Sequence, residues 1–471
     1  MTFASLTFIV FFILVIALEE ITNVKAVKEK FGNCVYFVRH MILLIASYIF
    51  YGWWDWRFCF LILFVTLIAY FAGLYHQNKA VLISAICIVL VVLGIFKYYN
   101  FFVESFCKMF SISRVGTLNI ILPVGISFYT FQAISYIADV HLGKIKAEQS
   151  FVNVALYIAF FPQLVAGPIV KASEFLPQLS EDRNVSIRNL ETGLQIFVFG
   201  LFKKVVLADN LSVYVDEVFR YPTVFSAETI AFAAVSYAMQ IYFDFSGYSD
   251  MAIGSAKCLG YDFTRNFNMP YISKNVSEFW KRWHISLSTW LKEYLYIPLG
   301  GNRKGKIRTY LNLMLTMALG GLWHGANWTF IVWGSLHGVA LCVHKKLAKK
   351  DSEQGVIQNI LYIIGTDVFV CFCWIFFRAD NISIAFIIIK RMIFLSKGVS
   401  HLYSWTFFSL LLMIVCHIKA YRKSETKNFC NGYYGIMDLS KISSLIIWFV
   451  FLGLTIGLAY TGASPFIYFQ F

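Results

Sequence analysis

Charged side chains are scarce in this sequence. Asp, Glu, Lys and Arg make up only 14% of its 471 residues, whereas 59% of the residues are hydrophobic. A water-soluble chain of this length needs far more polar surface to cover its core. The composition therefore excludes a soluble globular protein and predicts that most apolar side chains face lipid or one another.

Familiar catalytic and metal-binding motifs are also missing. The ten cysteines are scattered through apolar runs without a C-x-x-C pair, so they predict neither a disulfide set nor a zinc site. The chain has no P-loop, no G-x-S-x-G, no H-E-x-x-H and no paired carboxylates at catalytic spacing. We therefore expect no bound metal, and the ATPase and hydrolase interpretations lose their support.

Long apolar runs are what the sequence does contain. Runs of roughly 20 apolar residues, the length that crosses a ~30 Å hydrocarbon core, recur along the whole chain, and lipid forces such segments to be helical. The clearest are 2–18, 58–75, 80–96, 188–207, 224–243, 325–343, 356–377, 402–420 and 443–460; shorter or interrupted ones are 36–50, 119–138, 152–170 and 309–322. We expect an all-α polytopic membrane protein of one domain, 1–471, with about eleven spans or partial spans plus re-entrant or interfacial helices. The first run lacks a basic start and a cleavage site, so we interpret it as a retained helix.

The net charge of +14 is more typical of the positive-inside rule than of nucleic-acid binding. Basic residues cluster in four short loops: Lys25, Lys28 and Lys30; Arg303, Lys304, Lys306 and Arg308; Lys345, Lys346, Lys349 and Lys350; Arg422, Lys423 and Lys427. Placing these loops in the cytoplasm predicts that both termini lie outside. The basic residues around 390–397 then fall on the external side, which requires an interfacial helix there.

The segment 309–344 carries the first candidate for chemistry. Both of its ends are anchored by predicted cytoplasmic charge, so it must enter the membrane and return through a turn at 320–327. The first leg, 309–320, is about 18 Å long as a helix, too short to cross, which places His324 inside the membrane. An intramembrane imidazole is a candidate general base, although a buried structural histidine is the alternative, and it is the interpretation we favour for His337.

Three further polar stretches interrupt the apolar background. Two prolines and a glycine in 161–169 predict either a kink or a re-entrant turn. Asp244, at the end of an apolar run, predicts either an ion pair with a basic neighbour or a functional site. In 275–294, Asn275 and Glu278 predict a helix start, with Trp280, His284 and Ser288 on one stripe. This helix suits an interfacial anchor or, alternatively, a surface for an anionic cofactor such as coenzyme A.

Five motifs follow one another in order: Phe243–Gly254, Asn266–Tyr271, Phe279–Trp290, Tyr296–Arg303 and Leu322–Ala326. Together with Pro162–Pro168 they resemble the membrane-bound O-acyltransferase family, in its bacterial alginate O-acetyltransferase-like branch. The resemblance covers about 120–345, and the flanks agree mainly in hydropathy. It implies a ring of tilted helices around a thinned centre with a tunnel, through which an acyl group passes from a cytoplasmic thioester to an external acceptor.

The resemblance also implies roles for individual residues. The family's essential histidine matches His324, as base or as transient nucleophile, and its second histidine matches His284. No bound cofactor is implied; the donor is an acyl thioester, acetyl-CoA by expectation. Residues expected near the donor are Lys281, Arg282, Trp283, Asn302 and Arg303, and residues expected along the tunnel are Gln163, Asp244, Ser246, Tyr248, Trp323 and Asn327.

The implied setting is the bacterial cytoplasmic (inner) membrane. The implied partners are the lipid bilayer, an extracytoplasmic esterase-like transferase and a polysaccharide or peptidoglycan acceptor, with no nucleic acid. The tail 462–471 resembles the aromatic C-terminal motif of the small partner in the D-alanyl transfer system, which makes Tyr468 a candidate acyl relay. An aromatic anchor at the membrane interface is the alternative for Tyr468.

Other functions stay open at this point. Within the family, the rival is D-alanyl transfer from a carrier protein to teichoic acid. Outside it, the chain could be a transporter or flippase for a lipid-linked glycan, with His324 and Asp244 as proton-relay groups, or a non-enzymatic scaffold for polysaccharide export. A transporter would be expected to show paired repeats of broken helices, which the sequence does not show.

Overall fold

The computed structural model describes residues 1–23, 34–112, 116–180, 186–347, 355–424, 436–462 and 465–467. About 76% of these described residues are helical, and they contain no β-strand, only a bridge between Phe225 and Val399. The predicted all-α class is confirmed. Several predicted features lie outside the described residues: Lys25, Lys28, Lys30, Lys349, Lys350, Lys427 and Tyr468.

The chain forms two compact units. It passes from one to the other three times: within α11 (Ile187–Phe202), within α13 (Ala227–Cys258) and between Thr264 and Arg265. The first unit comprises Met1–Phe199 and Tyr248–Thr264; the second comprises Gly200–Gly247 and Arg265–Phe471. The single domain expected from the sequence stays a prediction.

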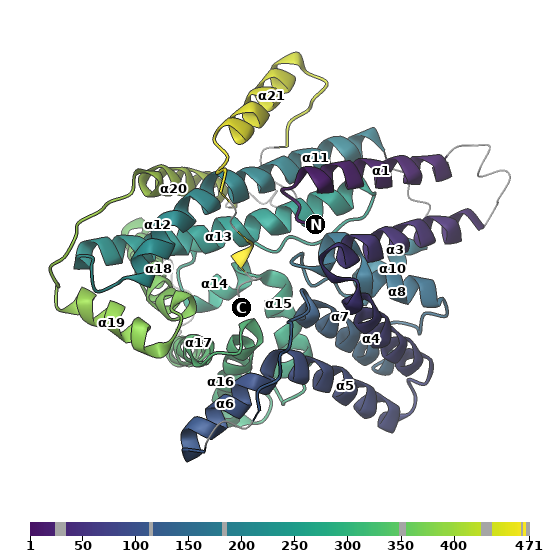
Figure 1. Cartoon of the computed structure of the whole chain (residues 1–471), viewed down its shortest axis with the longest axis horizontal. Coiled ribbons are helices and arrows are strands. Elements are labelled where there is room, and N and C mark those ends of the chain that lie inside the picture. Colours follow the sequence, from purple (N-terminus) through teal and green to yellow (C-terminus); the bar gives the residue numbers. More distant parts are fainter. Residues whose placement is uncertain are drawn as a thin grey trace. The chain divides into compact units, whose positions relative to one another are not determined.

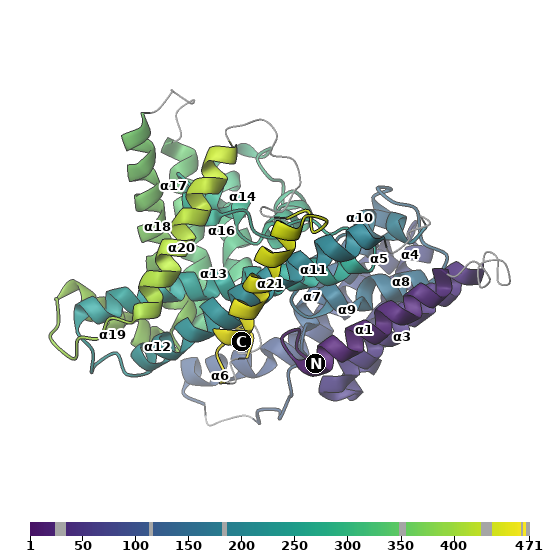
Figure 2. The same cartoon turned by 90° about the horizontal axis from the view of Figure 1, so that it is seen from above.

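In the first unit, the helix at the centre is α7 (Ile126–His141), which packs against its neighbours α4, α5, α8 and α10 (Figures 1 and 2). All but two of its sixteen residues are buried, although Ser127, Thr130, Gln132, Ser135 and Asp139 are polar. The other helices that lie wholly in this unit are α1 (Leu6–Asn23), α3 (Cys34–Asp55), α4 (Arg57–Leu74), α5 (Lys79–Leu93), η1 (Gly94–Tyr98), α6 (Tyr99–Phe110), α8 (Phe151–Ala159), α9 (Phe161–Leu164) and α10 (Ala172–Leu179).

The predicted break at the two prolines lies in this unit and is confirmed. Helix α8 ends at Ala159, the short α9 follows, and the backbone around Gly167 and Pro168 is irregular. A Cβ on Gly167 would lie 2.5 Å from the Cα of Gln163, so the turn needs glycine there. Every residue from 160 to 170 is buried, as irregular backbone in an apolar environment requires.

The second unit is built around a helical hairpin formed by α16 (Gly305–His324) and α17 (Trp328–Leu347), with α18 packed on α17 (Figures 1 and 2). The other elements that lie wholly in this unit are η2 (Lys203–Ala208), α12 (Asp209–Arg220), η3 (Pro270–Ile272), α14 (Val276–Arg282), α15 (Ile285–Leu291), η4 (Lys292–Tyr296), α18 (Val356–Arg378), α19 (Ile382–Ile393), α20 (Ser404–Ser424) and α21 (Ile442–Gly457).

The turn predicted at 320–327 is wrong in its first half. Helix α16 continues through the glycines to His324, so its 20 residues span about 30 Å and the argument from a short first leg fails. These glycines do not bend α16. They allow α16 and α17 to pack closely together. A Cβ on Gly321 would collide with the carbonyl oxygen of Phe330, and a Cβ on Gly334 would collide with that of Met317.

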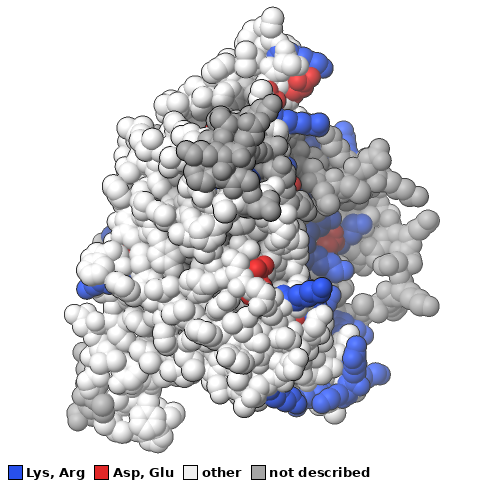
Figure 3. All heavy atoms as spheres, turned by 90° about the vertical axis from the view of Figure 1, so that its right-hand side faces the viewer, with Lys and Arg blue, Asp and Glu red and all other residues white. Residues whose placement is uncertain are grey.

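Apolar side chains cover much of the surface of both units. Large hydrophobic residues such as Ile13, Phe60, Val91 and Leu411 are more than half exposed. In the face shown in Figure 3, Lys and Arg gather on one side of the view, and the opposite side is almost free of charged residues. Such surfaces are stable in contact with lipid and not with water.

The number of spans was predicted as about eleven, and that number is not confirmed. Within the described residues, four helical segments are long and apolar enough to cross a membrane: Cys34–Asp55, Arg57–Leu74, Lys79–Phe110 and Val356–Arg378. Two shorter apolar helices are Ser404–Lys419 and Ile442–Gly457. Several apolar helices are therefore present.

We predict that Gly321→Ala and Gly334→Ala each destabilise the purified protein, because either methyl group forces α16 and α17 apart. The expected cost in the free energy of unfolding is about 1–3 kcal/mol, measured as a lower thermal midpoint in detergent. Gly453→Ala is the control, since a Cβ at Gly453 in α21 meets no atom within 4 Å. Equal midpoints for all three variants and the wild type would contradict the close packing.

Candidate active site

His324 is the last residue of α16 and is buried, with 3% of its surface exposed. Aromatic rings surround its imidazole. The ring centroids of Trp323 and Trp333 lie 5.1 Å from that of His324, and that of Phe377 lies 5.2 Å away. Trp328, the first residue of α17, is 50% exposed. The side chain at the predicted catalytic position therefore sits in a buried, aromatic environment.

His284 lies close to His324, with 6.4 Å between the two ring centroids. It does not lie on a continuous helix, so the predicted stripe of Trp280, His284 and Ser288 is wrong. Helix α14 ends at Arg282 and α15 begins at Ile285, because His284 adopts a left-handed backbone conformation with φ 42° and ψ 56°. For a residue with a Cβ this conformation costs about 1 kcal/mol or more, and such strain is typical of functional sites.

The amide of Asn266 holds this break in place. Its Oδ1 accepts hydrogen bonds from the backbone N–H of Ser286 at 3.2 Å and from the Ser286 hydroxyl at 3.0 Å, and it lies 3.1 Å from Nδ1 of His284. Because Oδ1 can only accept, Nδ1 of His284 must carry the proton. The other nitrogen, Nε2, is then a lone-pair acceptor, and it is buried without a partner among the described residues.

The predicted start of α14 is confirmed. The side chain of Asn275 accepts a hydrogen bond from the backbone N–H of Glu278 at 2.9 Å. Glu278 reaches back to the N–H of Lys274 at 2.9 Å and also pairs with Arg282 at 2.9 Å. The start of this helix is therefore closed from both sides, which fixes the chain leading into His284.

Asp244 forms the buried ion pair that the sequence left as one of two alternatives. Nζ of Lys204 lies 2.7 Å from a carboxylate oxygen of Asp244 and 2.7 Å from one of Asp209. All three side chains are at least nine-tenths buried. Lys204 belongs to η2, a π-helical turn that joins α11 to α12, and π-turns of this kind are common at functional sites.

The C-terminal segment is bound beside this ion pair. The backbone N–H of Ile467 donates to Oδ2 of Asp244 at 2.8 Å, and the N–H of Tyr460 donates to the carbonyl of Val205 at 2.8 Å. Phe466 and Ile467 are only 2% and 3% exposed. Tyr468, the predicted relay, is the next residue along the chain and lies outside the described residues.

A row of aromatic residues extends from His324, and the sequence did not single it out. Trp333 contacts His324, and the ring centroids of Trp333 and Trp280 lie 5.0 and 5.2 Å from that of His337. The indole N–H groups of Trp280 and Trp333 and both ring nitrogens of His337 are buried without hydrogen-bond partners among the described residues. A hydrogen-bonded structural role for His337 therefore finds no support in its surroundings.

The residues predicted to meet the donor are spread over two environments. Lys281 and Arg303 are exposed, and Asn302 is exposed with its Oδ1 accepting from Nζ of Lys345 at 2.6 Å. Arg282 is partly buried in its ion pair with Glu278. Trp283 is 1% exposed and stacks on Phe279, so it belongs to the interior of the unit.

The predicted tunnel residues also separate. In the second unit, Ser246 and Trp323 are buried, whereas Asn327 is partly exposed and donates to the carbonyl of Asp380 at 2.8 Å. Gln163 and Tyr248 belong to the first unit, where both are buried. Gln163 donates to the carbonyl of Tyr157 at 2.6 Å, and Tyr248 packs against Phe3. Their expected part in a tunnel stays a prediction.

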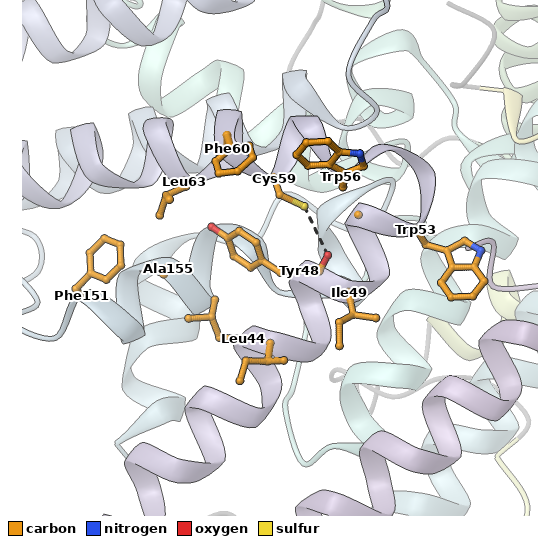
Figure 4. A pocket seen from close by; sticks show the side chains of 12 residues that line it. Leu44, Tyr48, Ile49, Trp53, Trp56, Cys59, Phe60, Leu63, Phe151 and Ala155 are labelled. Carbon is orange, nitrogen blue, oxygen red and sulfur yellow. Dashed lines mark hydrogen bonds between the residues drawn. The ribbon is translucent and has the colours of Figure 1, made fainter.

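The described residues contain no cluster of three His, Cys, Asp or Glu side chains that could hold a metal ion. One pocket, of about 690 Å³, lies in the first unit between α3, α4 and α8 (Figure 4). Its walls are formed mainly by apolar and aromatic side chains such as Leu44, Trp56, Phe60 and Phe151. It contains none of the predicted catalytic residues, so we assign the chemistry to the histidine pair and not to this pocket.

The histidine pair can accept one proton and pass it on. An imidazole with a free lone pair can accept a proton from a hydroxyl and deliver it to a leaving group. The fixed tautomer of His284 and the aromatic surroundings of His324 make the site pre-organised.

Comparison with known proteins agrees with this chemistry. Residues 144–379 match the model of MBOAT, the membrane-bound O-acyltransferase family. A probable alginate O-acetylase of Pseudomonas aeruginosa is 43% identical over 75% of this chain and 69% of its own length. A peptidoglycan O-acetyltransferase of Helicobacter pylori is 40% identical over 76% of this chain and 74% of its own. A teichoic acid D-alanyltransferase of Bacillus subtilis is 28% identical over 54% and 68%.

We predict that Asn266→Ala destabilises the protein by about 1–3 kcal/mol, because it leaves the buried N–H of Ser286 and the His284 ring without their acceptor. The measurement is the thermal unfolding midpoint in detergent. Asn302→Ala is the control, since it removes an amide whose hydrogen bonds lie at the surface. A midpoint for Asn266→Ala equal to that of Asn302→Ala would show that Asn266 does not hold the break.

Proposed function

Since the chain belongs to the membrane-bound O-acyltransferase family, we propose that it is a multi-pass membrane O-acetyltransferase that acetylates a cell-surface polysaccharide or peptidoglycan. The donor in this proposal is an acyl thioester, acetyl-CoA by preference. The Pseudomonas aeruginosa and Helicobacter pylori relatives, 43% and 40% identical, are both named for O-acetylation, whereas the Bacillus subtilis relative named for D-alanyl transfer is 28% identical. The acetyl group is therefore favoured over D-alanine.

The observation that carries the mechanism is the buried pair of imidazoles, with ring centroids 6.4 Å apart and one tautomer fixed by Asn266. In the proposed reaction, His324 accepts the proton of the attacking hydroxyl. The hydroxyl oxygen forms a bond to the thioester carbonyl carbon, the carbon–sulfur bond breaks, and His324 delivers the proton to the leaving thiolate. No proton is lost or gained overall.

We assign His284 a positioning role in this reaction. Its Nδ1–H is bound to Asn266, so its buried Nε2 can only accept a hydrogen bond. An acceptor hydroxyl that donates to Nε2 would be oriented toward a thioester placed beside His324. This orientation is the kind of advantage that a pre-organised site gives, because the reacting groups need not search for their geometry.

The aromatic row beside His324 supports the presence of a passage for the thioester arm. Buried indole and imidazole nitrogens without partners are costly, and they are satisfied when a polar chain passes along them. Trp280, Trp333 and His337 provide four such nitrogens. The exposed Lys281 and Arg303 are suited to the anionic part of a coenzyme A donor.

In this proposal, the C-terminal segment is the first acceptor of the acetyl group. Phe466 and Ile467 are buried beside Asp244, and Tyr468 follows directly. Tyr468 would take the acetyl group as a phenolic ester and pass it to an extracytoplasmic esterase-like partner, which acylates the polymer. We further propose that the helices form a ring around a tunnel in the bacterial cytoplasmic membrane, with both termini outside.

We predict that His324→Ala lowers the turnover of labelled acetyl-CoA by about 10²–10⁴-fold, the usual effect of losing a general base. The assay uses purified protein in nanodiscs with partner and acceptor supplied. His344→Ala, at the end of α17, is the histidine control and should retain the wild-type rate. Equal turnover by wild type and a folded His324→Ala protein would remove the acyltransferase mechanism and favour a transporter or scaffold.

We predict that Tyr468→Phe reduces acetyl transfer to the acceptor to background, because phenylalanine has no hydroxyl to esterify. Tyr460→Phe is the matched control, a tyrosine of the same terminal segment that is bound through its backbone N–H. The measurement is the appearance of labelled acetyl in the acceptor polymer. Full transfer by Tyr468→Phe would overturn the relay and leave the tail as an interfacial anchor.

A further inference from the structure

The carboxylate of Asp244 has two partners of different kinds. One oxygen lies 2.7 Å from the ammonium of Lys204, and the other accepts the backbone N–H of Ile467 at 2.8 Å. Lys204 also binds Asp209, so two buried carboxylates share one ammonium. Buried carboxylates of this kind are stabilised by hydrogen-bond donors that point at them. The Ile467 N–H is one donor of this kind.

The C-terminal segment is attached at more than one point. The carbonyl of Leu458 accepts from the side chain of Asn210 at 3.5 Å, and the N–H of Tyr460 donates to Val205 at 2.8 Å. Both contacts are to η2 and α12, the elements that also provide Lys204 and Asp209. The segment therefore approaches the ion pair along these two elements before it reaches Asp244.

The end of the segment lies one aromatic ring away from the histidine pair. The ring centroid of Phe466 is 5.9 Å from that of Phe245, and the centroid of Phe245 is 4.6 Å from that of His284. Asp244 and Phe245 are consecutive residues of α13. Asp244 binds the backbone of the tail, and Phe245 lies between the tail and His284. One peptide bond therefore fixes these two residues relative to each other.

We propose that Asp244 is the docking residue for the chain's own C-terminal segment. Its carboxylate, oriented by Lys204, fixes the backbone at Ile467 and so sets the position from which the next residue starts, within about 3.8 Å from one Cα to the next. Asp244 acts as a positioning residue and not as a proton-relay group. In combination with the proposed function, on which this last step rests, docking would allow Tyr468 to receive the acetyl group.

Hydrogen exchange of the C-terminal peptide in the full-length protein tests the docking directly. Asp244→Ala removes the acceptor, so the tail amides should exchange about tenfold faster or more, as loss of a hydrogen bond to a charged group requires. Asp216→Asn is the matched control, because Asp216 is paired with Arg378 and has no described contact with the tail. Equal exchange in wild type and Asp244→Ala would overturn the proposal.

Ile467→Pro tests the same contact from the side of the tail and leaves the buried ion pairs intact. Proline has no N–H, so the remaining tail amides should exchange as fast as in Asp244→Ala. Ile467→Val keeps the N–H and should behave as wild type. If Asp244→Ala does not fold, Ile467→Pro decides the matter: slow exchange in a folded Ile467→Pro protein would contradict docking through this hydrogen bond.

Activity separates the docking from the proposed relay. If both hold, Ile467→Pro lowers kcat for transfer to the acceptor and leaves KM for the thioester unchanged. If exchange responds as expected but Tyr468→Phe still transfers acetyl at full rate, the docking stands and the relay fails. Failure of the docking is recognised by the exchange measurement alone, whatever the transfer rate.

Discussion

One buried ammonium group organises the second unit. Lys204 binds Asp209 on α12 and Asp244 on α13, and Asp244 in turn binds the C-terminal segment. In an apolar interior, removing one member of such a group leaves an uncompensated charge, which is far more destabilising than the loss of a surface ion pair. The helices and the tail are therefore coupled through electrostatics at the point where α13 passes His284.

The second constraint is that buried backbone must be satisfied even where helices end. The chain breaks between α14 and α15, and the break is closed by Asn266, whose amide serves the backbone and the imidazole together. At Pro162–Pro168, by contrast, the irregular backbone is completely buried within the first unit. In both places the irregular backbone carries residues that the family motifs contain, which agrees with strain being retained where function needs it.

Hydropathy was sufficient to predict much of the fold. The predicted run 356–377 agrees with α18 within one residue, and most other runs agree within a few residues, because long apolar segments leave helix as the only stable choice. Helix ends were harder to predict. Glycines suggested a turn at 320, yet α16 continues to His324, since those glycines serve the close packing of two helices. Likewise, α13 continues past Asp244 to Cys258 although its polarity rises.

The site was predicted in part, for reasons that depend on the residue. His324 and His284 could be named from motifs, and the structure brings their rings together. The break at His284 could not be predicted, because nothing local in the sequence requires a left-handed histidine; it depends on Asn266, 18 residues away. Lys204 could also have been predicted from the sequence, because a lysine in an apolar run needs a carboxylate partner. Trp333 and Phe377 reach His324 only through tertiary packing.

The account holds that an acetyl group passes from a thioester, through the histidine pair, to the docked C-terminal segment. The most direct test is peptide mapping by mass spectrometry after brief exposure of the purified full-length protein to isotopically labelled acetyl-CoA. The account predicts labelled acetyl on the C-terminal peptide of the wild type, and its loss in His324→Ala. Labelled acetyl found on other peptides only, or on the C-terminal peptide of both proteins equally, would contradict it.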